Sequence, residues 1–196
     1  IFIRHYDVGE LSAASDATKD TPAPPPPPPG TRPTSGFLAL VDLIAEAPKP
    51  VVAAINGLCM GGGFELSLAC DIRIASPGVE AIGLPETRVG IFPGGGGTQR
   101  LPRVVGVEQA AIMCSLGAPI SATKALEFGL IDALATEGDL KADALAFARE
   151  CIAKGPRPTR DMPVNGDIGI IAKLEAENAR KWKGFDAPYA NLRCVA

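Results

Sequence analysis

Two glutamates and two glycine clusters between residues 51 and 100 are the groups whose types and spacing can do chemistry. Glu65 follows the glycines at 61–63, and Glu86 precedes the glycine run at 94–97. Two carboxyl groups brought to one site can divide acid and base catalysis, because close carboxylates favour one ionised and one neutral member. Glycines beside them let a substrate carbonyl approach the backbone closely.

The first glutamate is predicted to lie just inside a helix. Residues 51–55 form an apolar, β-branched run of strand length, which Asn56-Gly57 ends with turn chemistry. The glycines at 61–63 then open a helix that contains Glu65. Since the first amides of a helix lack internal partners and carry partial positive charge, the Gly62 N–H is the candidate donor to an oxyanion.

The second glutamate is predicted to lie on a rigid turn. A strand at 71–75 and a turn precede it, and Pro85 fixes the backbone directly before Glu86. The glycine run at 94–97 then leads into a second helix, with Thr98 as the expected N-cap. We expect this glycine run to be structural, shaping the wall of a pocket and the helix start, with contact to substrate as the alternative.

Three stretches carry a resemblance to a known family: KPVVAAINGLCMGGGFELSLACDIRIAS, GLPETRVGIFPGGGGTQRLPRVVG and SATKALEFGLIDAL. They resemble the crotonase, or enoyl-CoA hydratase/isomerase, superfamily. The C-terminal part is similar to the hydratase portion of multifunctional fatty-acid oxidation proteins. The resemblance implies an α/β fold with a crotonase-like (ββα)n spiral core and a C-terminal helical region.

The resemblance also implies roles for individual residues. Glu65 and Glu86 take the positions of the two catalytic glutamates, and the Gly62 and Tyr6 N–H groups take those of the oxyanion hole. Residues 1–11 carry this last match, although Arg4-His5 stands where the family has Ala-Gly. The remaining expected contacts are to substrate, from Gly61, Gly63, Pro85 and Gly94.

The activity implied is that of an enoyl-CoA hydratase in fatty-acid β-oxidation. The alternatives are an isomerase that shifts the double bond within the acyl chain, and a non-catalytic assembly subunit of the same fold. Coenzyme A is part of the acyl-CoA thioester substrate, so no separate cofactor and no metal are expected. The family resemblance implies a homotrimer or a dimer of trimers.

We expect the spiral core over residues 1–134, with N-terminal strands of the family missing, and the helical region over 135–196. Residues 12–36 contain six consecutive prolines, which favour polyproline II and a mobile surface loop. The minor alternative is a ligand for a proline-recognition domain. Apolar spacing predicts helices at 37–47, 107–116, 122–128, 140–154 and 168–183.

Composition excludes several classes of function. A formal net charge of −3 disfavours nucleic-acid binding. The five scattered cysteines form no C-x-x-C pair, which fits a reducing cytoplasm and no zinc site, and no apolar run reaches membrane-spanning length. His5 is the only histidine and there is no G-x-S-x-G motif, so a serine hydrolase is disfavoured. Neither glycine cluster fits a nucleotide-binding pattern.

Overall fold

The computed structural model describes residues 28, 31, 36–136 and 138–196. Tyr6 and most of the Pro-rich stretch at 12–36 lie outside the described residues. The helices and strands follow one another as α2 (Gly36–Ala45), β1 (Val52–Ile55), β2 (Cys59–Met60), α3 (Gly62–Ala69), β3 (Ile72–Ala75), β4 (Ile82–Gly83), the 3-10 helix η1 (Glu86–Val89), α4 (Gly97–Leu116), α5 (Ala122–Glu127), β5 (Ala133–Leu134), α6 (Leu140–Ile152), the 3-10 turn η2 (Thr159–Asp161), α7 (Ile170–Asn178) and α8 (Ala187–Val195).

A parallel three-stranded sheet, in the order β1-β3-β5, contains both strands that the sequence predicted. Val52 lies opposite Ile72 in its register. Because the strands run parallel, α3 makes the crossover from β1 to β3. Ala53 and Ile55 of β1 enter the main core. Val52 and Ala54, which point the other way, pack towards α6. The sheet is therefore covered on both faces.

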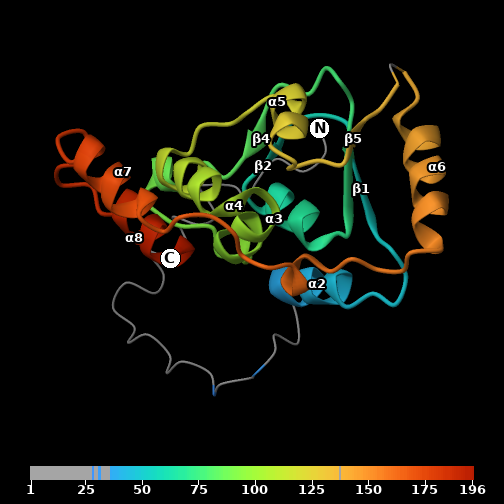
Figure 1. The fold of residues 1–196 in the computed structure, drawn as a ribbon, viewed down its shortest axis with the longest axis horizontal. Coiled ribbons are helices and arrows are strands. Elements are labelled where there is room, and N and C mark those ends of the chain that lie inside the picture. The colour runs from blue at the N-terminus through green and yellow to red at the C-terminus, as the bar shows by residue number, and fades with distance from the viewer. Residues whose placement is uncertain (1–27, 29–30, 32–35, 137) are drawn as a thin grey trace.

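The layers follow from this alternation. Figure 1 shows α6 on one side of the strands, with α3 and α4 on the other. The main core on that second side includes Phe64 and Leu68 of α3 and Leu101 of α4, all fully buried. A separate pair of short parallel strands, β2 and β4, lies at the start of α3. These two strands hold the glycine turn from which α3 begins.

Helix α4 joins the helix predicted to follow the glycine run with the helix predicted at 107–116, since it begins at Gly97 and ends at Leu116. It runs through Pro102 and bends at Gly106, whose φ of 81° and ψ of 162° are not helical. The prediction that Thr98 is the N-cap is wrong. Gly96 takes that position with a φ of 92°, a conformation that glycine adopts without strain, and Thr98 is buried in the first turn.

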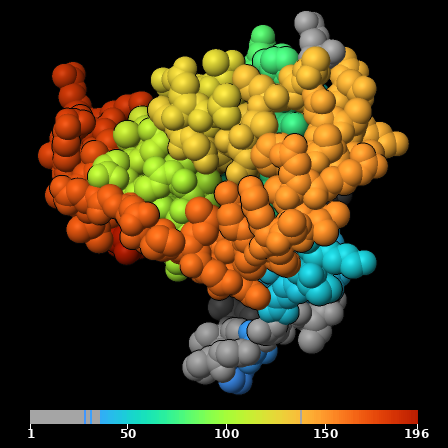
Figure 2. Space-filling view, turned by 45° about the vertical axis from the view of Figure 1, so that its right-hand side comes forward, coloured from blue at the N-terminus to red at the C-terminus, as the bar shows by residue number. Residues whose placement is uncertain are grey.

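The C-terminal helices join the same core as the α/β part. Leu174 of α7, together with Leu192 and Val195 of α8, belongs to the main buried cluster. The segment between α6 and α7 runs across the molecule and passes the residues after α2, as Figure 2 shows. An ion pair between Arg160 in this segment and Glu46, with Arg160 Nη1 3.0 Å from Glu46 Oε1, spans that crossing. The boundary at 134 and 135 remains a prediction.

A buried ionic cluster secures the end of α3. Arg73 of β3 is 1% exposed, and its Nη1 donates to the carbonyls of Ser67 at 3.2 Å and Cys70 at 2.8 Å. Its Nε donates to the Leu130 carbonyl at 2.9 Å. Asp132 supplies the nearby negative charge, with its carboxylate 3.9 Å from Arg73 Nη2. The last carbonyls of α3 are thus satisfied by a cation, the favourable sign at a helix C-terminus.

Candidate active site

Glu65 is held inside the protein by the way α3 begins. Gly61 precedes the helix with a φ of 55°, a backbone conformation that side chains disfavour, and its N–H donates to the Gly83 carbonyl at 2.9 Å. The Glu65 N–H in turn donates to the Gly61 carbonyl at 2.9 Å. Glu65 therefore lies in the first turn of α3 and is only 3% exposed, which is unusual for an ionisable residue.

The second glycine run surrounds the Glu65 carboxylate. The Gly97 N–H donates to Glu65 Oε1 at 2.8 Å, and the Gly95 amide also favours the charged carboxylate. A Cβ built on Gly95 would lie 2.6 Å from Glu65 Oε2, and one on Gly97 would lie 3.0 Å from Oε1. Only glycine permits this approach. The sequence predicted a pocket wall here, with substrate contact as the alternative, and missed the contact with Glu65, although the run of four glycines before a helix was its signal.

Glu86 lies on η1, directly after Pro85, and is half-buried. Burial raises the pKa of this carboxyl to about 7, and the negative charge of Glu65 adds to the rise. Its Oε2 is shielded from solvent and has no hydrogen-bond partner among the described residues. The two predicted catalytic carboxyls therefore lie close enough to influence each other.

The environments of the two carboxyls differ. Burial also raises the pKa of Glu65, but the Gly97 and Gly95 amides and the positive charge of Arg100 act in the opposite direction. In the described part of the chain, Glu86 receives a hydrogen bond only from its own backbone amide, with no amide from the glycine run and no cation acting on it. The arrangement favours an ionised Glu65 beside a neutral Glu86, as expected for a coupled pair of carboxyls.

The predicted oxyanion donor Gly62 is the first residue of α3, so its N–H has no partner within the helix. Gly62 is half-buried, whereas Gly61 and Gly63 on either side are buried. The ring of Phe37 on α2 lies 3.5 Å from where a Gly62 Cβ would be, and 2.7 Å from a Cβ on Gly95. Phe37 is thus a site neighbour that the sequence assigned only to a supporting helix.

Two other predicted contacts lie at the rim. Pro85 is half-buried beside Glu86, and Gly94 is exposed, with nothing within 4 Å of where a Cβ would be.

Cys114 of α4 is fully buried, and the charges of both Glu86 and Glu65 raise the pKa of its thiol further above the value that burial produces. The thiol is therefore a neutral wall of the site. Cys114 was not among the site residues predicted from the sequence.

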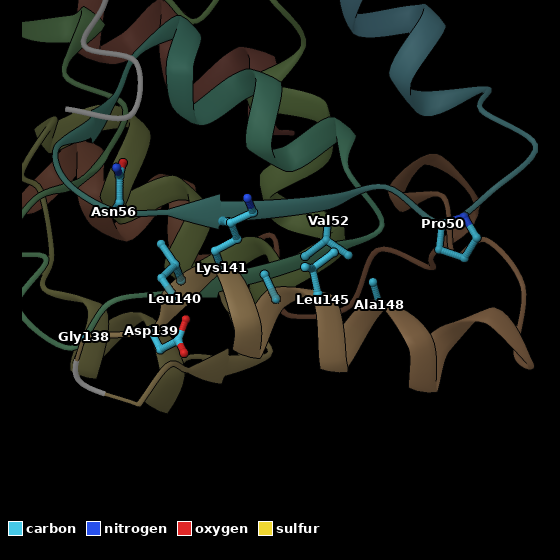
Figure 3. A pocket seen from close by; sticks show the side chains of 11 residues that line it. Pro50, Val52, Asn56, Gly138, Asp139, Leu140, Lys141, Leu145 and Ala148 are labelled. Carbon is cyan, nitrogen blue, oxygen red and sulfur yellow. The ribbon is translucent and has the colours of Figure 1, made fainter.

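A groove of about 770 Å³ lies elsewhere, between β1 and α6. Figure 3 shows Val52 and Pro50 on one wall, facing Leu140 and Leu145 of α6. None of the predicted site residues lines it.

Among the described residues there is also no group of three or more His, Cys, Asp or Glu side chains arranged for a metal. In the same part of the chain, no helix is both long and apolar enough to cross a bilayer.

The parallel strands and the helices that connect them form an α/β fold of the crotonase type. The chain belongs to the enoyl-CoA hydratase/isomerase family, whose sequence profile matches residues 28–164. Both the fold class and the family expected from the sequence are confirmed.

The similar proteins include multifunctional enzymes. The glyoxysomal fatty acid β-oxidation multifunctional protein MFP-a of Brassica napus is 40% identical over 159 residues, covering 76% of this chain and 22% of the relative. The peroxisomal fatty acid β-oxidation multifunctional protein AIM1 of Arabidopsis thaliana is 46% identical over 150 residues, covering 75% and 20%. This chain therefore spans about a fifth of the length of these relatives.

A solved structure supports the fold. The enoyl-CoA hydratase from Bacillus anthracis matches with a TM-score of 0.57 and 37% identity, covering 81% of this chain and 58% of that one.

Proposed function

We propose that this chain adds water across the 2,3 double bond of a 2-enoyl-CoA thioester. The observation that carries the proposal is the unequal pair of carboxyls. Glu65 receives amide hydrogen bonds, whereas Glu86 is half-buried and its Oε2 has no hydrogen-bond partner among the described residues. Hydration requires one group that accepts a proton and one that donates a proton. Membership of the enoyl-CoA hydratase/isomerase family supports the substrate class.

In this proposal the carboxylate of Glu65 accepts a proton from water as the water oxygen bonds to the β-carbon. The electrons of the double bond move towards the thioester carbonyl, whose oxygen gains negative charge. The neutral carboxyl of Glu86 then delivers its proton to the α-carbon. Glu65 ends protonated and Glu86 ionised, and the proton returns from one to the other between turnovers.

The developing oxyanion is the charge that backbone amides stabilise. The Gly62 N–H at the start of α3 is the first proposed donor, and the helix dipole adds to it. The Tyr6 N–H remains the second proposed donor. Loss of one such donor typically raises the barrier by roughly 2.7 to 4 kcal/mol.

The same site offers a second activity. The family includes isomerases, and a single carboxyl with a pKa of about 7 can move a proton between two carbons of an enoyl chain. This Δ3-Δ2-enoyl-CoA isomerase activity needs Glu86 but not Glu65. A substrate with its double bond at position 3 therefore distinguishes the two reactions.

Further properties are proposed on the same basis. Coenzyme A enters with the substrate, no cofactor is required, and the subunits form trimers. The curated relatives are named as β-oxidation proteins, which supports that process here. Their names place them in glyoxysomes and peroxisomes, so a peroxisomal location is the alternative to the cytoplasm suggested by the cysteines.

Loss of the enoyl-thioester absorbance on mixing the chain with crotonyl-CoA, or with a longer 2-enoyl-CoA, tests the proposal. We expect loss with the unaltered chain and none with Glu65→Gln or Glu86→Gln. Glu80→Gln is the matched control because Glu80 is exposed. Retained hydration in Glu86→Gln contradicts the assigned roles. A folded chain that converts only the 3-enoyl substrate is an isomerase, and one that converts neither fits a non-catalytic subunit.

A further inference from the structure

The glycine run at 94–97 separates the Glu65 carboxylate from the side chain of Arg100. On one side, the Gly97 N–H donates to Glu65 Oε1 at 2.8 Å. On the other side, Arg100 Nη1 donates to the Gly95 carbonyl at 2.8 Å. The Arg100 guanidinium also occupies the space that a Gly96 side chain would take. The backbone of residues 95–97 therefore lies between the Arg100 guanidinium and the Glu65 carboxylate and is hydrogen-bonded to both.

Arg100 is held in place rather than free in solvent. Its side chain is 15% exposed, and Nη2 lies 4.0 Å from Asp42 Oδ1 on α2. Burial lowers the pKa of the guanidinium from its very high ordinary value, which leaves the group charged. Arginine presents several N–H donors in a fixed plane, so one bond to the loop and one ion pair to α2 are compatible.

We propose that Arg100 is a positioning residue: its hydrogen bond to the Gly95 carbonyl orients the loop so that the Gly95 and Gly97 amides point towards Glu65. Its effect is to keep the Glu65 carboxylate ionised and ready to accept a proton. The importance of Arg100 for turnover rests on the proposed hydration. Its effect on the ionisation of Glu65 follows from the geometry alone and does not depend on which reaction the site catalyses.

Other charges act on the same carboxylate and must be considered. Within the part of the chain that the structure describes, the charges that act on Arg100 are those of Asp42 on α2, Arg160 on η2 and Glu65 itself. The charge of Glu65 in turn acts on Glu86 of η1 and on Cys114 of α4. The Cys114 thiol is neutral over the working range of pH, because burial raises its pKa. Among the described residues, Arg100 is the cation that lowers the pKa of Glu65. Removal of Arg100 is therefore expected to raise the pKa of Glu65, which makes this carboxyl harder to ionise.

The direct test is a carboxyl titration of the free protein by NMR, with carbon-13 in the glutamate side chains and Glu65→Gln to assign the signal. In Arg100→Met we expect an ionisation constant for Glu65 lower by roughly tenfold. Arg100→Gln, which keeps an N–H donor but no charge, is the second variant, with a decrease of roughly threefold or more. Arg103→Met is the matched control, since Arg103 also lies on α4 but donates to the Met162 carbonyl at 2.7 Å.

The result that overturns the proposal is a Glu65 titration in folded Arg100→Met or Arg100→Gln that matches the unaltered chain. A second readout is the pH profile for crotonyl-CoA, in which the acidic limb of kcat/KM moves to higher pH while KM stays the same. A role in folding alone lowers kcat without moving that limb. If the NMR shift occurs in a chain without hydratase activity, the positioning role holds and the proposed function fails.

Discussion

The Gly97 N–H donates to Glu65 Oε1 at 2.8 Å across a sequence separation of 32 residues. This bond joins the two glycine-containing turns, one before α3 and one before α4, through a buried carboxylate. It follows that the second glycine run is part of the apparatus that sets the charge of Glu65.

Gly95→Ala should reduce hydration strongly. The added Cβ would lie 2.6 Å from Glu65 Oε2 and 2.7 Å from the Phe37 ring, so the loop or the carboxylate must move. Because small misplacements of catalytic groups are costly, we expect kcat to fall by roughly tenfold to a hundredfold. Gly78→Ala is the control, since nothing lies within 4 Å of where its Cβ would be. Equal kcat values for the two variants would refute this expectation.

The rate should decrease on the alkaline side. Glu86 has a pKa raised to about 7 by burial and by the charge of Glu65, so its proton is present below that pH and is lost above it. If Glu86 donates to the α-carbon, kcat/KM must fall as pH rises through about 7. Steady-state kinetics with crotonyl-CoA measure this. A kcat/KM that increases through the same range would mean that Glu86 acts as a base.

The fold around Glu65 was largely predictable from the sequence, because β1, α3 and β3 carry strong local patterns. Two features of the structure could not be predicted in this way. Strands β2, β4 and β5 have two residues each and show no periodicity. The contact between Glu65 and Gly97 depends on packing between distant turns, and a sequence without an alignment does not report such contacts.

The N-cap of α4 shows the same limit at a local scale. Thr98 has the side chain preferred at that position, but Gly96 takes it with a φ of 92° and Thr98 is buried. The position of Phe37 beside Gly62 was similarly hidden, because apolar spacing identifies the helix and its buried face but not the element that the face covers.

Glu86→Gln should stabilise the protein at alkaline pH. The pKa of Glu86 is higher in the folded chain than its ordinary value, so the stability linked to it is present below about 4.5 and is lost as pH rises through about 7. The amide cannot ionise, so relative to the unaltered chain we expect a gain on the order of 2 kcal/mol at alkaline pH. Urea unfolding at mildly acidic and mildly alkaline pH measures this, with Glu80→Gln as control. A gain of equal size at both pH values would exclude ionisation as its cause.

Arg73→Met should destabilise the fold. It removes a cation that is 1% exposed and the side-chain hydrogen bonds that this cation donates to three carbonyls, and it leaves Asp132 without its buried partner. Such losses cost about 3 to 5 kcal/mol. Arg157→Met removes a side chain that is 50% exposed and should cost about 1 kcal/mol or less. Chemical unfolding gives both values, and equal costs would show that the burial of Arg73 is unimportant.

We propose that two carboxyls in unequal environments add water to an enoyl thioester. The most direct test of this claim is to incubate crotonyl-CoA with the chain in oxygen-18 water and to analyse the product by mass spectrometry, with Glu65→Gln and Glu86→Gln in parallel. We predict a 3-hydroxyacyl product that carries one heavy oxygen from the unaltered chain, and no product from either variant. Product formed equally well by both folded variants, or no product from the folded unaltered chain, would contradict the claim.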